Sequence, residues 1–335
     1  MRVAINGFGR IGRLVFRIMN ESDEFDIVAV NSSKDAEHLA YLLKYDTCHR
    51  RYRDEEVSSD DSHIIVGNKK TLVISESDPE KLPWKELDID MVFECTGKFT
   101  NEEDANKHIV AGAKKVIISA PAKGNVKTIV YGVNENILTG DERIISAASC
   151  TTNCLAPILK VVNDNFGIKR GFMTTVHAYT NDQNTLDGSH KKGIRSRRGR
   201  AAAENIVPTS TGAADAIGKV ISELDGKMKG SAMRVPVADG SVIDLVLELE
   251  RNVNVPIINN IFRAAKSEVL GVTEDPIVSS DVIGDTHGGI VDLELTDVLE
   301  VNGEKLVKII GWYDNEMGYS YQMVRTAKYF GNLWF

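Results

Sequence analysis

The chain of 335 residues carries 40 basic and 48 acidic side chains, for a formal net charge of −8. Its 42% hydrophobic and 26% charged residues are typical of a globular protein and exclude a disordered, collagen-like or coiled-coil chain. No apolar run approaches the roughly 18 residues of a membrane helix. The acidic balance also disfavours nucleic acid or acidic membranes as partners. At roughly 150 residues per domain, the length predicts two domains.

The cysteines bear on where the protein works. There are four, which is too few for a disulfide framework, and their spacing is not that of a zinc site. We therefore expect reduced thiols and no bound metal. Met1 leads into the apolar residues 3–5 without the features of a signal peptide. These observations predict a cytoplasmic protein, in which any special cysteine is special for its reactivity.

Strand and helix patterns alternate in the first part of the chain. Short apolar runs predict strands at 2–6, 26–31, 90–95, 115–119, 128–133 and 143–147. Apolar residues at helical spacing predict helices at 13–19 and 39–45. Thr100 and Glu103 have the spacing of a capping box before a helix that ends near 110. This alternation indicates a parallel sheet with both faces covered.

The pattern changes after about residue 150. A helix is predicted from 151 to about 165, and another at 316–330. Between them, long strands are predicted at 171–178, 232–237, 241–249, 289–295 and 306–312. Apolar and polar residues nearly alternate over 241–250, which is typical of an antiparallel sheet with one covered face. We therefore expect an α/β protein whose second domain starts near 148–151 and has a mostly antiparallel sheet.

A glycine-rich turn follows the first predicted strand. Gly7, Gly9 and Gly12 form G-x-G-x-x-G between a strand and a helix, with a second strand about twenty residues later. The first glycine permits the tight turn, the second lets the backbone approach a pyrophosphate, and the third lets the helix pack closely on the sheet. The pattern predicts a Rossmann dinucleotide-binding domain through about residue 148; a glycine-rich turn without a ligand is the alternative.

The end of the second strand bears on the choice of dinucleotide. NAD-binding folds usually place an acidic residue here, where it binds the ribose 2′-hydroxyl. This chain has Asn31, Ser32 and Ser33, and its first acid is Asp35. The serine hydroxyls could donate to the 2′-phosphate of NADP, or they could cap the turn. These residues alone leave both interpretations open.

Cys150 follows the predicted strand 143–147 and opens a helix. Because a helix N-terminus stabilises a thiolate, we expect a lowered pKa and a nucleophilic sulfur; an ordinary structural cysteine is the alternative. Cys154 lies inside the same helix, where we expect a buried small apolar side chain. His177 lies on a predicted strand. It can serve as a base only if the fold brings it to Cys150, and it is otherwise an ordinary core or surface histidine.

Cations and hydroxyls gather in the second half of the chain. Lysine and arginine occupy six of the ten positions 191–200, which fits a small phosphate ligand, a nucleic-acid patch or a solvated loop. Thr211 and Gly212 precede a helix and suit an oxyanion. Arg234 is a cation inside an apolar strand. It needs an anionic partner, which could be a ligand or a structural carboxylate.

Taken together, these segments resemble the phosphorylating glyceraldehyde-3-phosphate dehydrogenases. The similar stretches are 5–13, 149–157, 174–183, 208–214, 232–236 and 311–317, in the family's order and over nearly the full chain. The stretch Ser-Cys-Thr-Thr-Asn-Cys at 149–154 is highly specific. The resemblance implies a Rossmann domain of residues 1–148 joined by the C-terminal helix 316–335, a mixed α/β catalytic domain of residues 149–315, and a homotetramer.

The resemblance also implies a reaction. Cys150 would attack the aldehyde of glyceraldehyde 3-phosphate to form a thiohemiacetal, with His177 as the base. Hydride transfer to a nicotinamide would leave a thioester, which inorganic phosphate would attack to release 1,3-bisphosphoglycerate. The phosphate-binding positions would be Thr180 and Arg234 for the substrate, Ser149, Thr151, Thr211 and Gly212 for the attacking phosphate, and Arg198 for both. The cofactor-binding positions would be Asn6, Gly7, Phe8, Gly9, Arg10, Ile11, Gly12, Ser32, Ser33, Ser119, Ser189, Asn315 and Tyr319.

Four positions depart from the pattern of the NAD-using members. Ser32 stands where they have aspartate, and Ser189 stands where they have proline before His190. Members that use NADP resemble this chain at both points, so we expect NADP to be accepted and preferred, with NAD as the second cofactor. Ser77 replaces an arginine on the adenosine side, and Asp215 replaces a lysine beyond the phosphate turn.

Two other functions are compatible with parts of the sequence. Erythrose-4-phosphate dehydrogenases have similar cysteine and histidine segments, but the turn at Thr211 and Gly212 favours the phosphorylating enzyme. A non-catalytic dinucleotide-binding or interaction protein would not need Cys150, His177 and the cations for two phosphates.

Overall fold

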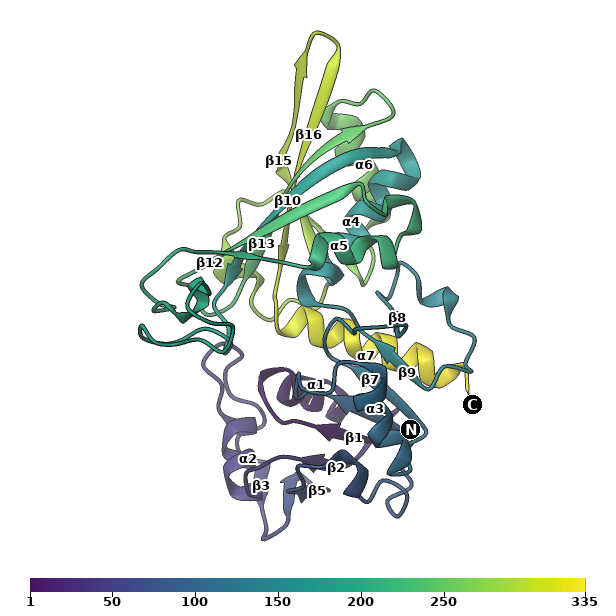
Figure 1. Cartoon of the computed structure of the whole chain (residues 1–335), viewed down its shortest axis with the longest axis vertical. Coiled ribbons are helices and arrows are strands. Elements are labelled where there is room, and N and C mark those ends of the chain that lie inside the picture. Colours follow the sequence, from purple (N-terminus) through teal and green to yellow (C-terminus); the bar gives the residue numbers. More distant parts are fainter. Residues whose placement is uncertain (335) are drawn as a thin grey trace. The chain divides into compact units, whose positions relative to one another are not determined.

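The computed structural model describes residues 1–334 (Figure 1). By their contacts these residues form two compact units. The first comprises Met1–Ser149 and the chain from Ser320 onward, and the second comprises Cys150–Tyr319. Each unit is built around one sheet.

The first unit contains a nine-stranded sheet in the order β3-β4-β5-β2-β1-β6-β7-β9-β8. All pairs from β5 to β8 are parallel, whereas β3, β4 and β5 pair antiparallel at one edge. The strands are β1 Arg2–Asn6, β2 Asp26–Asn31, β3 Val57–Ser59, β4 His63–Val66, β5 Lys69–Ile74, β6 Met91–Glu94, β7 Lys115–Ile118, β8 Lys127–Thr128 and β9 Ile144–Ser146. The parallel centre confirms the expected Rossmann-type fold.

Helices cover both faces of this sheet. They are α1 Arg10–Asn20, α2 Ala36–Lys44, α3 Glu102–Val110 and α7 Met317–Asn332, with the short helices η1 Pro79–Lys81 and η2 Glu135–Ile137. Alternate residues of a strand point to opposite faces. Val3 and Ile5 accordingly share a core with α1, α2 and Phe330 of α7, whereas Ala4 shares a second core with Ile109 of α3. Burial of each large apolar side chain contributes roughly 1.5–3 kcal/mol, so both cores hold the strand ends in place.

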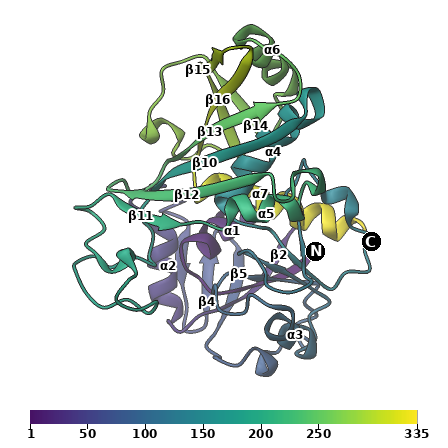
Figure 2. The same ribbon diagram turned by 45° about the horizontal axis from the view of Figure 1, so that its top comes forward.

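The second unit contains a seven-stranded sheet in the order β11-β12-β10-β13-β16-β15-β14, of which β10, β12 and β13 lie side by side in Figure 2. Only β10–β12 and β14–β15 pair in parallel, so the sheet is mostly antiparallel, as expected. The strands are β10 Ile168–Ala178, β11 Val207–Ser210, β12 Met228–Val235, β13 Ser241–Leu249, β14 Leu270–Thr273, β15 Gly289–Val301 and β16 Glu304–Tyr313.

One face of this second sheet is covered by α4, which contacts β10, β13, β15 and β16. Along β13, Ile243, Leu245 and Leu247 are buried, whereas Val246 between them is exposed. This alternation matches the sequence pattern. The other elements of the unit are α4 Cys150–Phe166, α5 Ala213–Ala216, α6 Val255–Ala265, η3 Arg197–Gly199, η4 Ile217–Lys219, η5 Ser222–Leu224 and η6 Ser279–Val282.

Two local predictions are wrong. The strand predicted at 128–133 is the two-residue β8, because Asn134 turns the chain there: its side chain accepts from Val130 N at 2.8 Å and donates to Thr128 O at 2.9 Å. The cap of α3 is Asn101 rather than Thr100. Its side chain accepts from Asp104 N at 2.8 Å, so the helix begins one residue later than the capping box predicts.

We predict that Asn101→Ala lowers the free energy of unfolding by about 1 kcal/mol, because the Asp104 N–H loses its acceptor. Thr100→Ala is the matched control and should cost less than about 0.5 kcal/mol. Urea unfolding followed by circular dichroism measures both. A larger loss for Thr100→Ala would contradict the assigned cap.

Candidate functional site

Cys150 and His177 meet in the second unit. Cys150 is the first residue of α4, and His177 lies on β10. The distance from Cys150 Sγ to His177 Nε2 is 3.4 Å, which is within hydrogen-bonding range for sulfur. Two residues earlier, Ala148 adopts φ 59°, a backbone region that costs a residue with a Cβ about 1–3 kcal/mol. The chain thus accepts local strain just before the cysteine.

The surroundings of His177 favour one tautomer. Its Nδ1 lies 2.7 Å from Ala178 O, and a carbonyl oxygen can only accept. Arg234 Nη1 is 3.1 Å from the same nitrogen, but it has acceptors of its own in Ala178 O at 3.0 Å and Thr180 Oγ1 at 2.9 Å. We therefore assign the hydrogen to Nδ1. This leaves the lone pair of Nε2 directed at the Cys150 thiol.

Burial sets the protonation of the pair. It raises the pKa of the Cys150 thiol, and the opposing effects of Arg234 and of the N–H groups of Cys150 and Thr151 do not cancel it. The expectation of a lowered pKa is therefore wrong for this structure, although the helix N-terminus lies where it was predicted. Burial and the charge of Arg234 also lower the pKa of His177 to about 3. A neutral thiol consequently faces a neutral imidazole.

A chain of polar contacts leads away from His177. Arg234 is next to His177 because β12 and β10 pair these two residues in register. Thr180 accepts from Arg234 and donates to Asp182 Oδ1 at 2.5 Å. Asp182 also forms an ion pair with Arg198 Nη1. Asp182 therefore contacts one cation, Arg198, directly and is joined to a second, Arg234, through the Thr180 hydroxyl.

Asp182 was missed by the sequence reasoning. Asp182 is the nearby anion that Arg234 was expected to need. Burial lowers the pKa of that arginine, and the charge of the Asp182 carboxylate opposes this fall. The hydrogen bond from Thr180 lowers the pKa of Asp182 in turn, together with the charges of Arg198 and Arg234. An acid two residues after Thr180, in a region rich in arginine, was the available signal. Arg198 also donates to Thr209 Oγ1 at 3.1 Å. This bond attaches the loop of residues 189–200, here called the basic loop, to β11.

The remaining predicted residues of this half differ in their burial and in their hydrogen-bond partners. Thr151 follows Cys150, and its hydroxyl is 3.0 Å from the Tyr313 hydroxyl. Asn315 is buried, and its Oδ1 accepts from Ser241 Oγ at 2.6 Å. Thr211 accepts from Ala213 N at 3.2 Å and Gly212 precedes the four-residue α5, whereas Tyr319 is buried and Ser189 is exposed on the basic loop.

The glycine turn of the first unit fits a dinucleotide. Gly7 has φ 96°, and a Cβ built on Gly12 would lie 2.1 Å from Gly7 O, so larger residues are excluded at both positions. A Cβ on Gly9 would meet nothing within 4 Å. Gly9 is the N-cap of the 11-residue α1 and has no side chain that could cap the helix. A helix N-terminus next to free space is a favourable binding site for a pyrophosphate.

The other predicted cofactor residues surround or underlie this turn. Phe8 is buried, Arg10 forms an ion pair with Asp46, and Ile11 packs against the core. Asn6 is buried, and its side chain is bonded inside the protein. Ser33 is exposed and Ser32 half-buried, with Ser32 Oγ accepting from Lys34 N at 3.4 Å. Ser119 follows β7 and donates its N–H to Glu94 O at 2.9 Å. Ser149 is half-buried directly before Cys150.

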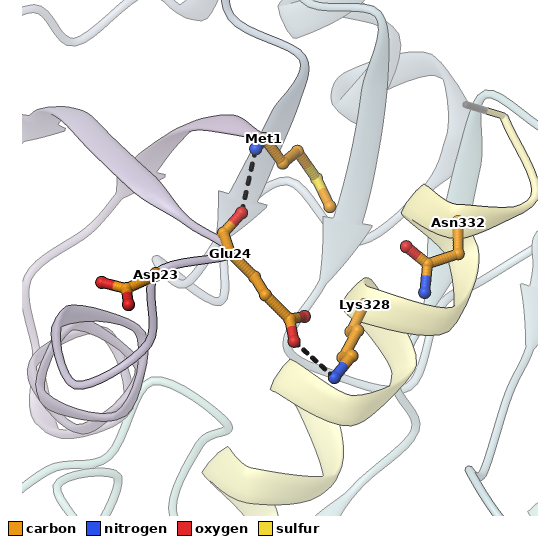
Figure 3. A pocket seen from close by; sticks show the side chains of 5 residues that line it. All are labelled: Met1, Asp23, Glu24, Lys328 and Asn332. Carbon is orange, nitrogen blue, oxygen red and sulfur yellow. Dashed lines mark hydrogen bonds and ion pairs between the residues drawn. The ribbon is translucent and has the colours of Figure 1, made fainter.

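A separate hollow of about 470 Å³ lies in the first unit (Figure 3). It is lined by Met1, Asp23, Glu24, Lys328 and Asn332. The Met1 ammonium donates to Glu24 O at 2.9 Å, and Lys328 pairs with Glu24 Oε1 at 2.6 Å. None of these residues was predicted to function, and the cations already have partners, so we do not place the site here.

Within residues 1–334, no helix has both the length and the apolar character that crossing a membrane requires.

Comparison with known proteins gives matches over both halves of the chain. Residues 1–102 match the family described as glyceraldehyde 3-phosphate dehydrogenase, NAD binding domain, and residues 149–315 match its C-terminal domain. Similar relatives named glyceraldehyde-3-phosphate dehydrogenase occur in Clostridium pasteurianum, with 55% identity over 332 residues, and in Clostridium acetobutylicum, with 54%. A relative of the same name in Streptococcus pyogenes is 50% identical over 334 residues. In all three the match covers 99% of each chain.

The protonation of the pair predicts how Cys150 reacts with iodoacetamide. Because the thiolate is the reactive form and burial raises the thiol pKa, the rate should keep rising from pH 7 to pH 9 in the ligand-free protein. His177 should add no inflection near pH 6.5, since its pKa is lowered to about 3. Cys150→Ser provides the background from the other cysteines. A plateau that is reached below pH 7 would instead indicate a preformed thiolate–imidazolium pair.

Proposed function

Because the chain belongs to the glyceraldehyde-3-phosphate dehydrogenase family, we propose that it converts glyceraldehyde 3-phosphate and inorganic phosphate reversibly to 1,3-bisphosphoglycerate. The 3.4 Å contact between Cys150 Sγ and His177 Nε2, beside Arg234, carries the proposal. It joins a nucleophile, a base and a cation, which are the groups this reaction needs from the protein.

We propose that His177 accepts the thiol proton as Cys150 attacks the aldehyde carbon. The neutral imidazole directs the Nε2 lone pair at the thiol, while Nδ1–H is held by Ala178 O. Proton transfer concerted with attack avoids a free thiolate, which burial disfavours. The thiohemiacetal and then the thioester form on the same sulfur. When bound, the nicotinamide supplies the hydride acceptor.

The polar side chains around Cys150 and His177 supply sites for two phosphates. We propose that Thr180 and Arg234 bind the substrate phosphate, and that Arg198 acts beside both phosphates. Ser149, Thr151, Thr211 and Gly212 would bind the attacking phosphate. The hydroxyls and guanidinium groups of this set are donors, as binding of a phosphate oxygen requires. Asp182, which joins Thr180 to Arg198, keeps these donors in position.

We propose that the glycine turn of residues 6–12 holds the pyrophosphate and that Asn315 holds the nicotinamide amide, with Tyr319 nearby. Ser241 supports the second role because it donates to Asn315 Oδ1, and the amide Nδ2–H groups then remain as donors. We also propose that Ser119, which directly follows β7, contacts the cofactor.

We further propose that NADP is used in preference to NAD. Ser32 and Ser33 follow β2 where an acid would repel a 2′-phosphate, and exposed Lys34 comes next. The first acid after them in the chain, Asp35, caps α2, where its side chain accepts from His38 N at 2.8 Å. In a tetramer like that of the family, Ser189 of a neighbouring subunit would complete the site.

A homotetramer is part of the proposal. On the sheet face opposite α4, Phe172 pairs with Val246, and Leu299 pairs with Leu306. All four are exposed, with Phe172 at 70%. Exposed apolar pairs on a sheet face, here next to the ion pairs of Glu248 and Asp244, are typical of a surface that another chain covers.

The proposal includes the functional division into residues 1–148 with 316–335 and residues 149–315. The division of the structure into two compact units, with boundaries at Cys150 and Ser320, supports these limits to within a few residues. We also propose the cytoplasm as the place of action, which four free thiols support.

The two alternative functions are not favoured. The two matched domains and the three relatives described above carry the glyceraldehyde-3-phosphate dehydrogenase name. The contact between Cys150 and His177 favours an enzyme over a protein that only binds the dinucleotide.

We predict that Cys150→Ser lowers phosphorylating turnover by at least about 10⁴-fold, because the hydroxyl is a far weaker nucleophile than the thiol. The variant should still bind the dinucleotide in a titration. Cys48→Ser, which removes a half-buried thiol of the first unit, is the control and should keep full activity. Product formation must also require inorganic phosphate. Turnover that is unchanged in Cys150→Ser, or independent of phosphate, would reject the proposed reaction.

We predict that kcat/KM is higher with NADP than with NAD, and that Ser32→Asp reverses the order. The added carboxylate should raise the KM for NADP by about tenfold or more through charge repulsion, and change that for NAD by less than about threefold. Ser32→Ala separates loss of the hydroxyl from addition of charge. A wild-type protein that strongly prefers NAD would refute the cofactor proposal and leave the reaction untouched.

A further inference from the structure

A row of buried polar side chains crosses the first unit where three neighbouring strands end. Asn31, Asn6 and Glu94 are the last residues of β2, β1 and β6, and the strand registers place them side by side. Asn31 Nδ2 donates to Asn6 Oδ1 at 2.7 Å, and Asn6 Nδ2 donates to Glu94 Oε2 at 2.6 Å. Glu94 is 1% exposed. The reaction proposed above does not use its carboxyl group.

Four hydrogens point at the Glu94 carboxylate. Oε1 accepts from the N–H of Thr96 at 2.8 Å and from the Thr96 hydroxyl. Oε2 accepts from Asn6 Nδ2 and from His108 Nε2, the latter at 3.1 Å. Trp84 Nε1 can only donate, so its 3.0 Å contact makes His108 Nδ1 the acceptor and leaves the ring hydrogen on Nε2. An acceptor with no hydrogen of its own is therefore required at Glu94.

The same contacts support the dinucleotide turn. A Cβ on Gly7 would lie 2.8 Å from Thr96 N, so Thr96 forms the wall on which the turn rests. Gly7 N donates to Asn31 O at 2.9 Å, and Cys95 N donates to Asn6 O at 2.7 Å. The side chain of Asn31 bonds the backbone of Glu76 twice: Nδ2 donates to Glu76 O at 2.8 Å, and Oδ1 accepts from Glu76 N at 3.0 Å. These bonds fix the loop after β5.

We propose that Glu94 is a positioning residue for the dinucleotide: its buried carboxylate ties Asn6 to Thr96 and so holds the Gly7 turn in its binding geometry. This inference rests on the proposed dinucleotide-dependent function and adds to it a residue that need not touch the cofactor. The four donors account for the choice of an acid at a buried position, where a charge is otherwise costly.

The test compares the affinity of wild type and Glu94→Gln for NAD+ and NADP+ by calorimetric titration of the ligand-free protein. The amide of glutamine must turn its NH₂ group toward Thr96 or toward Asn6 and His108, where donors already stand. We expect Kd and the dinucleotide KM to rise about tenfold, with kcat and Cys150 alkylation within about twofold of wild type.

Two further variants separate positioning from stability. Trp84→Phe removes the far end of the network, so it should lower Tm and leave Kd within about twofold. The exchange Asn6→Asp with Glu94→Gln reverses the hydrogen bond between positions 6 and 94 and offers His108 Nε2–H an acceptor at position 6, whose side chain lies 3.3 Å away, so it should recover most of the lost affinity. Should Glu94→Gln not fold, Thr96→Val, which removes one hydroxyl donor, should raise Kd about threefold.

The outcomes are distinct. If wild type binds neither dinucleotide, the proposed function fails. If wild type binds and Glu94→Gln binds equally well despite a lower Tm, Glu94 is structural only and this inference is overturned. An unchanged Kd in Thr96→Val, or a Trp84→Phe variant that weakens binding as much as Glu94→Gln, would overturn it as well.

Discussion

The contact between the Cys150 sulfur and the His177 imidazole depends on a coincidence of two backbone positions. One is the start of α4 at Cys150, which follows the left-handed backbone conformation of Ala148. The other is the register of β10 on β12, which brings the imidazole beside a guanidinium. A shift of one residue in that register would turn His177 to the opposite face of the sheet. The alternating core of the second sheet, with Leu245 and Leu247 packed inward, is what prevents the shift.

Sequence reasoning predicted the features that have a strong period. The strands at 2–6, 26–31 and 241–249 match the structure in both bounds, since an apolar run or an alternation defines them. The antiparallel strands between Val57 and Ile74, and the helix α6, were not predicted. The strands are short and partly exposed at the sheet edge, so burial leaves little pattern in their sequence.

The misses near the candidate site have another origin. The acid two residues after Thr180 was visible in the sequence, but its ion pair with Arg198 was not, because the distant partners of a carboxylate cannot be read from spacing. The direction of the Cys150 pKa was wrong for a related reason. A helix N-terminus is a local feature that the sequence reveals, whereas the depth at which a sulfur is buried depends on the whole fold.

The carboxylate of Asp182 also has a kinetic meaning. It pairs with Arg198 and accepts from the Thr180 hydroxyl, so a phosphate bound at the proposed site would have to compete with an anion that belongs to the protein. Such competition would weaken ground-state binding of a phosphate ester. It would also shorten the residence time of the proposed doubly phosphorylated product, because the Asp182 carboxylate takes the place of the departing group. A phosphate site that contains its own carboxylate would bind its ligand less tightly and release it faster.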